Sequence, residues 1–216
     1  KEIHILYIIK ASSEENEYNI YHHYYNGKSW EDFIVEKIVA KKVLNPIKVI
    51  KNEANIILAY YRKDNEIVIR EFNPTNRQWS KGEILTNTDE EKLFIDMIKL
   101  NDTIHTAYCE YEEGSLEVKY KALAYSDGAY SEITEETISN PGSPSYPNLI
   151  LYSNKLWLTL VELNKIISRS SEDGGKTWGP ILQWDDSRTI DFLRYKYLTM
   201  VEDNNIKLDF SFGSIS

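Results

Sequence analysis

The sequence has few of the residues that staple small domains together or that cross membranes. Its 216 residues include one cysteine, Cys109, so no disulfide can form within the chain. No run of about 18 apolar residues occurs, which excludes a transmembrane helix. Positive charge is also in deficit, because 25 Lys and Arg face 34 Asp and Glu. The resulting net charge of −9 argues against nucleic acid or an anionic membrane surface as a partner.

The residues that are abundant favour strands. Sixteen tyrosines and five tryptophans stand against only nine glycines and six prolines. Apolar residues make up 42% and charged residues 27%, a composition typical of a soluble globular protein and not of a disordered one. A chain of this length can bury about 70% of its unfolded surface, which allows a sizeable core. Cys109 lies in one of the apolar runs and is therefore expected to be buried.

The sequence contains an internal repeat of about 50 residues. Short apolar runs recur at intervals of 48 to 53 residues, and they are Ile3–Tyr7, Ile56–Tyr60, Ile104–Tyr108, Leu156–Leu160 and Ile206–Phe210. An aromatic residue recurs with the same period, at Trp30, Trp79, Tyr130 and Trp178. Two independent markers with one period indicate a repeat architecture.

Each period holds four strand-like runs separated by turn residues. In the second repeat these runs cover 47–51, 55–61, 66–72 and 79–85, and in the fourth they cover 148–152, 156–162, 166–170 and 178–183. Four short antiparallel strands in every 50 residues are typical of β-propeller blades, whose two faces are covered by neighbouring blades. A β-sandwich, the main alternative, does not predict a four-strand period.

The sequence therefore predicts an all-β fold, a single β-propeller domain of four-stranded antiparallel blades with about five repeat units. The predicted units cover residues 1–44, 45–91, 92–144, 145–187 and 188–216. Three units are complete. The first lacks its innermost strand, and the last supplies only the runs 193–200 and 205–212. The pattern leaves open whether these units close a ring of five blades or form part of a larger ring.

One turn carries a specific motif. Residues 171–178 match S-x-D-x-G-x-T-W at every fixed position, with Ser171, Asp173, Gly175, Thr177 and Trp178. The match resembles the Asp-box, or BNR repeat, of sialidase-like β-propellers. Asp173 can accept hydrogen bonds from its own turn, and Gly175 can adopt a positive φ. The resemblance implies a structural role for this turn, on the face opposite the active site of those propellers.

The sequence predicts no catalytic set, metal site or cofactor. The resemblance to sialidases would require three arginines, a Tyr–Glu nucleophile pair and an acidic residue, and this pattern is not met. His22 and His23 are adjacent on a predicted strand and so face opposite ways, which disfavours a shared metal. Lys48, Asp96 and Asn148 occupy one equivalent position before the second strand of their repeats. We expect them to line a water-filled channel, where Asp96 is a candidate ligand contact.

Two predicted inter-blade loops are the best candidates for a ligand site. Residues 140–147 contain three prolines and present Tyr146. Residues 184–188 combine an aromatic residue, two acids and a base, namely Trp184, Asp185, Asp186 and Arg188. An aromatic ring beside carboxylates suits the stacking of a sugar and the binding of its hydroxyls. The same residue types also form hot spots in protein interfaces.

These observations favour a non-catalytic module that binds a glycan or a protein through the inter-blade loop face. The alternative is a glycoside hydrolase of the sialidase-like type, and a purely structural or assembly role is also open. The sequence does not decide the oligomeric state. It leaves the compartment open, with an extracellular or cell-surface location favoured over the cytoplasm.

Overall fold

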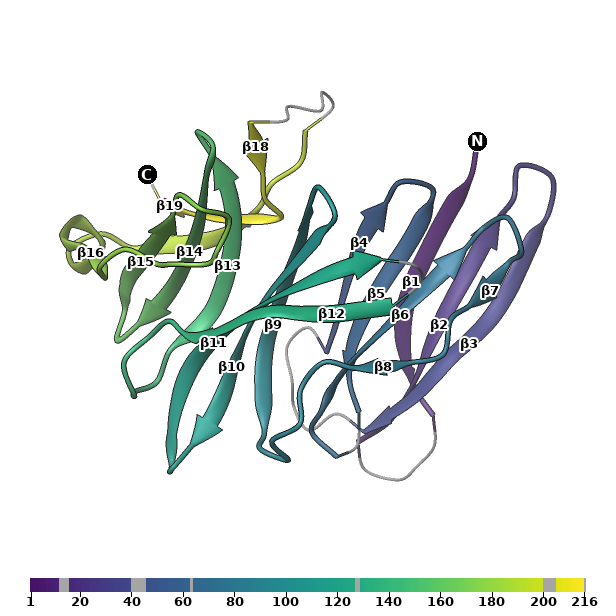
Figure 1. Ribbon diagram of the computed structural model, residues 1–216, viewed down its shortest axis with the longest axis horizontal. Coiled ribbons are helices and arrows are strands. Elements are labelled where there is room, and N and C mark those ends of the chain that lie inside the picture. The colour runs from purple at the N-terminus through teal and green to yellow at the C-terminus, as the bar shows by residue number, and fades with distance from the viewer. Residues whose placement is uncertain (12–15, 40–45, 63, 127–128, 200–204, 216) are drawn as a thin grey trace. The chain divides into compact units, whose positions relative to one another are not determined.

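A computed structural model shows a protein made of antiparallel β-sheets, as Figure 1 illustrates. The structure describes residues 1–11, 16–39, 46–62, 64–126, 129–199 and 205–215. The predicted fold class, all-β with four-stranded antiparallel blades of the propeller type, is confirmed. The predicted boundary between the first two repeats, at 44/45, falls outside the described residues. By internal packing the chain forms two compact units, Lys1–Asp89 and Glu90–Ser216.

The first unit contains two sheets. One is a three-stranded meander of β1 (Ile3–Lys10), β2 (Glu17–Tyr25) and β3 (Trp30–Val39), without the innermost strand that the later repeats have. The other runs in the order β4 (Ile47–Asn52), β5 (Asn55–Tyr61), β6 (Ile67–Asn73) and β7 (Gln78–Trp79), with β8 (Glu83–Ile84) also paired to β6. The predicted strand 79–85 is therefore broken into β7 and β8, on either side of residues 80–82.

The second unit contains two further blades. The first has the order β12-β11-β10-β9, built from β9 (Lys92–Leu100), β10 (Thr103–Glu112), β11 (Ser115–Ser126) and β12 (Ala129–Thr137). The second contains β13 (Ser145–Tyr152), β14 (Lys155–Glu162), β15 (Lys165–Ser171) and β16 (Leu182–Trp184), followed by the 3-10 turn η1 (Asp185–Arg188). The strand predicted at 178–183 begins only at Leu182. Pro180 lacks a backbone N–H and cannot donate to a ladder.

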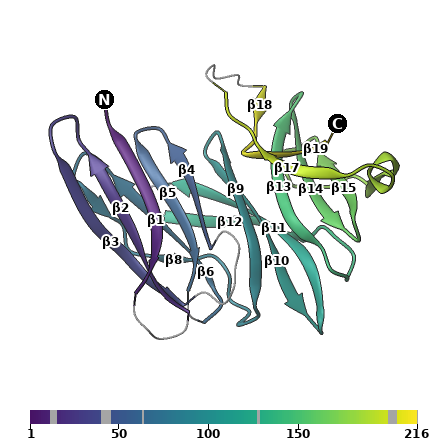
Figure 2. The ribbon, with the colours of Figure 1, turned by 180° about the vertical axis from the view of Figure 1, so that it is seen from behind.

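The C-terminal residues depart from the predicted pattern. The run 205–212 was expected to be one strand, but it divides into β18 (Ile206–Lys207) and β19 (Phe210–Ser214). β18 pairs with β13 and extends the fourth blade, while β19 pairs with β17 (Phe192–Lys196), as Figure 2 shows. Met200, the last residue of the predicted run 193–200, lies outside the described residues. The prediction of a single strand at 205–212 was therefore wrong.

Tight turns connect the first three strands of the fourth blade. Ser153 and Asn154 both have positive φ between β13 and β14, and Leu163 and Asn164 do the same between β14 and β15. Two consecutive residues with positive φ form the type I′ turn, whose twist matches that of antiparallel strands. Because these two hairpins are short, the register of β13, β14 and β15 is set locally.

Neighbouring sheets bury their apolar faces against each other within each unit. In the first unit Leu58 and Tyr60 of β5 pack with Ile20, Val35 and Ile38 of the preceding sheet. In the second unit a cluster of the same kind joins the two blades through Ala107, Cys109, Val118, Ala122, Leu149, Leu156, Leu158 and Leu160. Cys109 is fully buried, as expected from its apolar run. The second strands β5 and β10 are buried on both faces for this reason.

The expectation of a water-filled channel lined by Lys48, Asp96 and Asn148 was wrong. Their exposed fractions are 7%, 1% and 0%, so the position that they share is buried. Buried polar groups must find partners within the protein. Asp96 finds one in the backbone N–H of Leu149, at 2.7 Å from its Oδ2.

Two buried histidines make the stability of the fold depend on pH. Burial lowers the pKa of His22 to about 4, with the charges of His4 and His23 acting in the same direction, and burial alone lowers the pKa of His105 to about 4. In the unfolded chain both groups titrate near 6.5. Between these values the unfolded state binds more protons than the folded state, so the free energy of unfolding decreases as the pH falls.

We expect a loss of about 3 kcal/mol for each histidine between pH 7.5 and pH 4. Urea unfolding followed by circular dichroism at a series of pH values measures it. The variant His105→Gln removes one titrating group, so its stability should change less over this interval than that of the wild type. Equal slopes for the two proteins would contradict the assignment to His105.

Candidate functional site

The turn that carries the complete sequence motif is held by its own side chains. Asp173 Oδ1 accepts hydrogen bonds from the backbone N–H groups of Lys176 and Thr177, at 3.0 and 2.9 Å. Asp173 Oδ2 accepts from the Thr177 hydroxyl at 2.6 Å, and Ser171 Oγ donates to Oδ1 and accepts from Gly175 N–H. These bonds hold the pKa of Asp173 well below its ordinary value, and the bond from the Thr177 hydroxyl contributes most. All the donors belong to the turn itself, which is the arrangement of a structural carboxylate.

This turn also packs on the neighbouring blade. Gly175 is buried with φ of +89°, and a Cβ placed on it would lie 1.8 Å from the Tyr120 hydroxyl. The Tyr120 ring meets Trp178 edge to face at a centroid distance of 4.9 Å, and its hydroxyl lies 2.6 Å from His105 Nδ1. The motif thus fastens the fourth blade to β11 of the third. Tyr120 was missed in the sequence, because only the fold brings it to the turn.

Trp184 exposes its side chain to solvent but is held in place by hydrogen bonds. It is the last residue of β16 and is 55% exposed. Its indole Nε1 donates to Ser168 Oγ at 3.0 Å, and its carbonyl oxygen accepts from the Ser187 hydroxyl. Ser187 Oγ in turn accepts from the backbone N–H of Ile166 at 2.9 Å, which ties the turn to β15. A side chain that is held at one edge and open on its surface keeps its orientation before any ligand binds.

The predicted charged residues lie in η1, directly after Trp184. Asp185 and Arg188 form an ion pair across one turn, with 3.4 Å between Nε and Oδ1, and their side chains are 80% and 49% exposed. Asp186 is exposed, and its carbonyl oxygen accepts from Thr189 N–H at 3.1 Å. The structure therefore keeps Trp184, Asp185, Asp186 and Arg188 together in one exposed group, which we name the Trp184 group.

Tyr146 lies elsewhere, at an irregularity that occurs twice in the second unit. β13 has a register shift between Ser145 and Asn148, and β9 has one opposite Ala107 and Cys109. Each shift contains an aromatic residue with positive φ, Tyr146 at +51° and Phe94 at +57°. Such bulges re-aim side chains, and positive φ is costly for an aromatic residue. The two rings pack together at 4.6 Å between centroids.

A polar cluster lies beside these two rings, with Asp96 and Asn148 buried and Arg194 half-buried. Arg194 of β17 donates from Nε and Nη2 to Asn148 Oδ1, at 3.0 and 2.8 Å. Its guanidinium carbon lies 3.7 Å from the Phe210 ring centroid and 5.4 Å from that of Tyr146. Burial lowers the pKa of Arg194, while the charge of Asp96 opposes this. We name Asp96, Tyr146, Asn148 and Arg194 the Arg194 cluster.

The six predicted ligand residues thus fall into two places. Four form the Trp184 group, and Asp96 and Tyr146 belong to the Arg194 cluster. No hydrogen bond, ion pair or ring contact joins the two sets within the part of the chain that the structure describes. Arg194 was missed as a partner because its contact with Asn148 spans 46 positions in the chain. The repeat did place Asp96 and Asn148 at equivalent positions, and this equivalence was the one sequence signal for the Arg194 cluster.

Other reactive side chains are accounted for by the fold. Burial raises the pKa of Cys109, whose Sγ donates to the carbonyl oxygen of Pro144 at 3.5 Å. Among the described residues no three His, Cys, Asp or Glu side chains gather closely enough to hold a metal ion. No helix in the described ranges has the length and hydropathy needed to cross a membrane.

Comparisons with known proteins give similarities of fold only. No family model matches the chain, and no curated protein matches its sequence. One similar solved structure is the Bacteroides ovatus xyloglucan PUL GH43B protein, with 11% sequence identity and a TM-score of 0.43. The match covers 83% of this chain and 42% of that chain. Another is the WD40 domain of SCAP from fission yeast, with 10% identity, 99% and 49% coverage, and a TM-score of 0.47.

A third is a mutant of AofleA from Arthrobotrys oligospora, with 12% identity, coverage of 98% of this chain and 66% of that chain, and a TM-score of 0.47. The chain spans less than two thirds of the length of each of these three structures.

Proposed function

We propose that this protein is a non-catalytic glycan-binding module and that the Trp184 group is its binding surface. The observation that carries the proposal is the state of Trp184, half exposed with its indole N–H bound to Ser168. The aromatic face of such a side chain offers the flat apolar surface on which a sugar ring stacks. The chain needs no rearrangement to present it.

The neighbouring charges supply the polar part of the site. Asp185 and Asp186 carry exposed carboxylates that can accept hydrogen bonds from sugar hydroxyls. Arg188 can donate from the guanidinium N–H groups that Asp185 and Gln183 leave open. The proposed contacts are therefore Trp184 for stacking and Asp185, Asp186 and Arg188 for hydroxyl recognition. Tyr146, which is half-buried in the Arg194 cluster, is proposed as a secondary ligand contact. Asp96 is buried beside it and is proposed to act on a ligand only through the charge that it places near Arg194.

Two features support binding over glycoside hydrolysis. Most glycosidases use two carboxyl groups that face each other across the scissile bond. Asp96 is 1% exposed and its Oδ2 is engaged by Leu149 N–H, so this carboxyl is poorly placed to meet a substrate. Asp185 and Asp186 lie in an exposed turn, which does not hold two carboxyl groups facing each other across a bond.

The hydrogen bonds of Asp173 support the further proposal that residues 171–178 form a true Asp-box. In that case the turn is structural and Asp173→Ala leaves ligand binding unchanged. We expect the same variant to lower the melting temperature, by roughly 5 °C, because two backbone N–H groups lose their acceptor. Thermal unfolding and glycan binding measured on one preparation test both statements, and lost binding in a folded Asp173→Ala protein would contradict the structural role.

A glycan array probed with the wild type, Trp184→Ala and Trp30→Ala tests the proposed function. Trp30 is the matched control, because it is also half exposed, at 51%, but lies on the first sheet. We expect specific binding by the wild type and by Trp30→Ala, and at least a 10-fold weaker affinity for Trp184→Ala, as for the aromatic hot spot of an interface.

Two results would overturn the proposal. Absence of binding across a broad array would leave a protein partner as the function to pursue. Equal binding by Trp184→Ala and the wild type would place any glycan site away from the Trp184 group. Circular dichroism of the three proteins establishes that each variant is folded.

A further inference from the structure

The first sheet carries a hydrogen-bonded row of three reactive side chains. In the register of this sheet His23 of β2 lies opposite Asp32 of β3, and Tyr7 of β1 lies one diagonal step from His23. Directly opposite and diagonal positions on one face of a sheet are within reach of aromatic side chains. The Tyr7 hydroxyl contacts His23 Nε2, and His23 Nδ1 contacts Asp32 Oδ1. The strand pairing itself therefore assembles the row.

The chemistry of the three groups fixes the direction of the protons. An ionised aspartate only accepts hydrogen bonds, so Nδ1 of His23 must carry the hydrogen that it shares with Asp32. In a neutral imidazole the other nitrogen, Nε2, is then an acceptor, and the Tyr7 hydroxyl must donate to it. The rings of Tyr7 and His23 are nearly parallel, with 9° between their planes. The arrangement is a phenol held against a base that a carboxylate orients, which is the logic of an activated nucleophile.

The internal repeat shows that this row is particular to the first sheet. The fifth residue of the apolar run is tyrosine in the first three repeats, at Tyr7, Tyr60 and Tyr108. Tyr60 and Tyr108 are each 1% exposed, and their hydroxyls donate to Glu36 and Glu135 at 3.1 and 3.3 Å. Tyr7 is half-buried and faces a histidine instead. The position that is structural in two repeats is thus both accessible and paired with a base in the first.

The surroundings of the row favour an uncharged electrophile. The side chains of His23 and Asp32 are 33% and 69% exposed, so a small molecule can approach. Ile5 and Ile34 on the same face are 46% and 65% exposed and offer an apolar surface for a reagent. Within the described residues no lysine or arginine is paired with Tyr7, His23 or Asp32. A phosphoryl group would need such cations, whereas an ester carbonyl does not.

We propose that Tyr7 is a nucleophilic tyrosine that accepts an acyl group from uncharged activated esters. In this step Tyr7 Oη attacks the ester carbonyl carbon while its proton passes to His23 Nε2. Asp32 holds the imidazolium that forms. The bond from the carbonyl carbon to the leaving aryl oxygen breaks, the aryl oxide takes the proton from Nε2, and the acyl group remains on Tyr7 as an ester. No electron transfer and no further reactant is needed.

Site-resolved acetylation by p-nitrophenyl acetate tests the proposal in the wild type alone. Tyr25 is the internal reference, because it lies on the same face and packs against Trp30 at 5.2 Å between centroids. Peptide mass spectrometry over a time course gives the acetylation rate of each tyrosine. We expect Tyr7 to react about 100-fold faster than Tyr25, the lower end of the range for general-base assistance. Equal rates at the two tyrosines would overturn the proposal.

Variants show whether the reactivity of Tyr7 depends on His23 and Asp32 or only on the exposure of the Tyr7 hydroxyl. His23→Gln should lower the rate at Tyr7 about 100-fold, and Asp32→Asn should lower it by a smaller factor, because the imidazole remains but loses its orientation. Tyr25→Phe should leave the rate at Tyr7 unchanged. A folded His23→Gln protein that acetylates Tyr7 as fast as the wild type would overturn the role of the base. This inference is independent of glycan binding by the Trp184 group.

Discussion

Replacing Gly175 by alanine should destabilise the protein by about 4 kcal/mol, whereas Gly174→Ala should cost about 1 kcal/mol. The two glycines are adjacent in the same turn and both have positive φ, +89° and +73°. They differ in their surroundings. A Cβ on Gly175 would overlap the Tyr120 hydroxyl at 1.8 Å and its Cζ at 2.5 Å, while a Cβ on Gly174 meets nothing within 4 Å. Backbone strain is common to both variants, and steric overlap is confined to Gly175→Ala.

Chemical denaturation of the two variants measures this difference. The double variant Tyr120→Leu with Gly175→Ala should lose less free energy than the sum of the single changes, because the overlapping atoms are removed together with the cost of overlap. Equal stability of Gly174→Ala and Gly175→Ala would contradict the packing of this turn on the third blade. The comparison therefore tests the contact between Gly175 and Tyr120 of the neighbouring blade, because the added methyl group meets Tyr120 only in Gly175→Ala.

Leu158→Ala should lower the free energy of unfolding by about 3 kcal/mol. Leu158 lies in β14, is 0% exposed and belongs to the cluster that joins the two blades of the second unit. Truncating it removes apolar burial and leaves a cavity that the surrounding strands of both blades can fill only in part. The matched control is Leu163→Ala, because Leu163 follows the same strand but is 77% exposed.

Urea unfolding of both leucine variants gives the result. Leu163→Ala should stay within about 0.5 kcal/mol of the wild type, as is usual for exposed side chains. Similar losses for the two variants would mean that β14 does not bury its face against the third blade. Such a result would contradict the blade-on-blade packing of this unit.

The repeat allowed most of the fold to be predicted, because each blade is specified by local information. Alternating apolar residues and short turns define the strands, and β5 was predicted with both of its bounds, Asn55–Tyr61. The errors occur where a strand depends on distant partners. β18 was assigned to a fifth blade, but it pairs with β13, more than 50 residues earlier in the sequence. Local patterns carry no information about such a partner.

The candidate site was predictable in part for the same reason. The Trp184 group is consecutive in sequence, so its members stay together in the fold. The Arg194 cluster draws on β9, β13 and β17, and its residues meet only after the strands have paired. Asp96 was expected to face a water-filled channel because polar residues recur at its position in the repeats. The structure instead buries it, since a backbone N–H replaces the water that it would otherwise bind.

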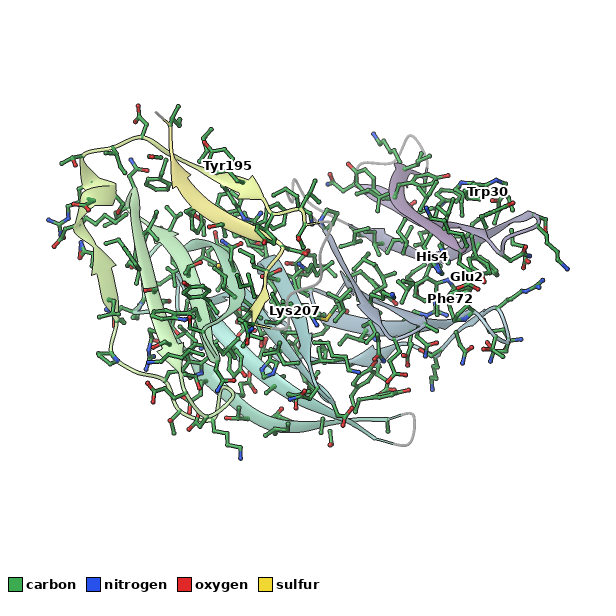
Figure 3. All side chains as sticks on the ribbon, turned by 90° about the horizontal axis from the view of Figure 1, so that it is seen from above. Glu2, His4, Trp30, Phe72, Tyr195 and Lys207 are labelled. Carbon is green, nitrogen blue, oxygen red and sulfur yellow. The ribbon has the colours of Figure 1, made fainter. Side chains whose placement is uncertain are left out.

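The aromatic core of the first unit shows a further limit of pattern analysis. His4, His22, Tyr24 and Phe72 form one ring cluster, with His4 and Phe72 meeting at 5.8 Å between centroids (Figure 3). The sequence disfavoured a metal shared by His22 and His23, but it gave no sign that His22 would be fully buried among aromatic rings. Composition alone does not distinguish a histidine that packs from one that binds.

If Trp184 is the ligand platform, the NMR signal of its indole N–H must respond to a bound glycan. The chain has five tryptophans, so a ¹⁵N-labelled sample gives few indole signals, and Trp184→Phe identifies the one from Trp184. On titration with a glycan that binds on the array, we predict a saturable shift of the Trp184 signal and none of the Trp30 signal. A bound glycan that leaves the Trp184 signal unmoved would contradict the role of Trp184 in binding.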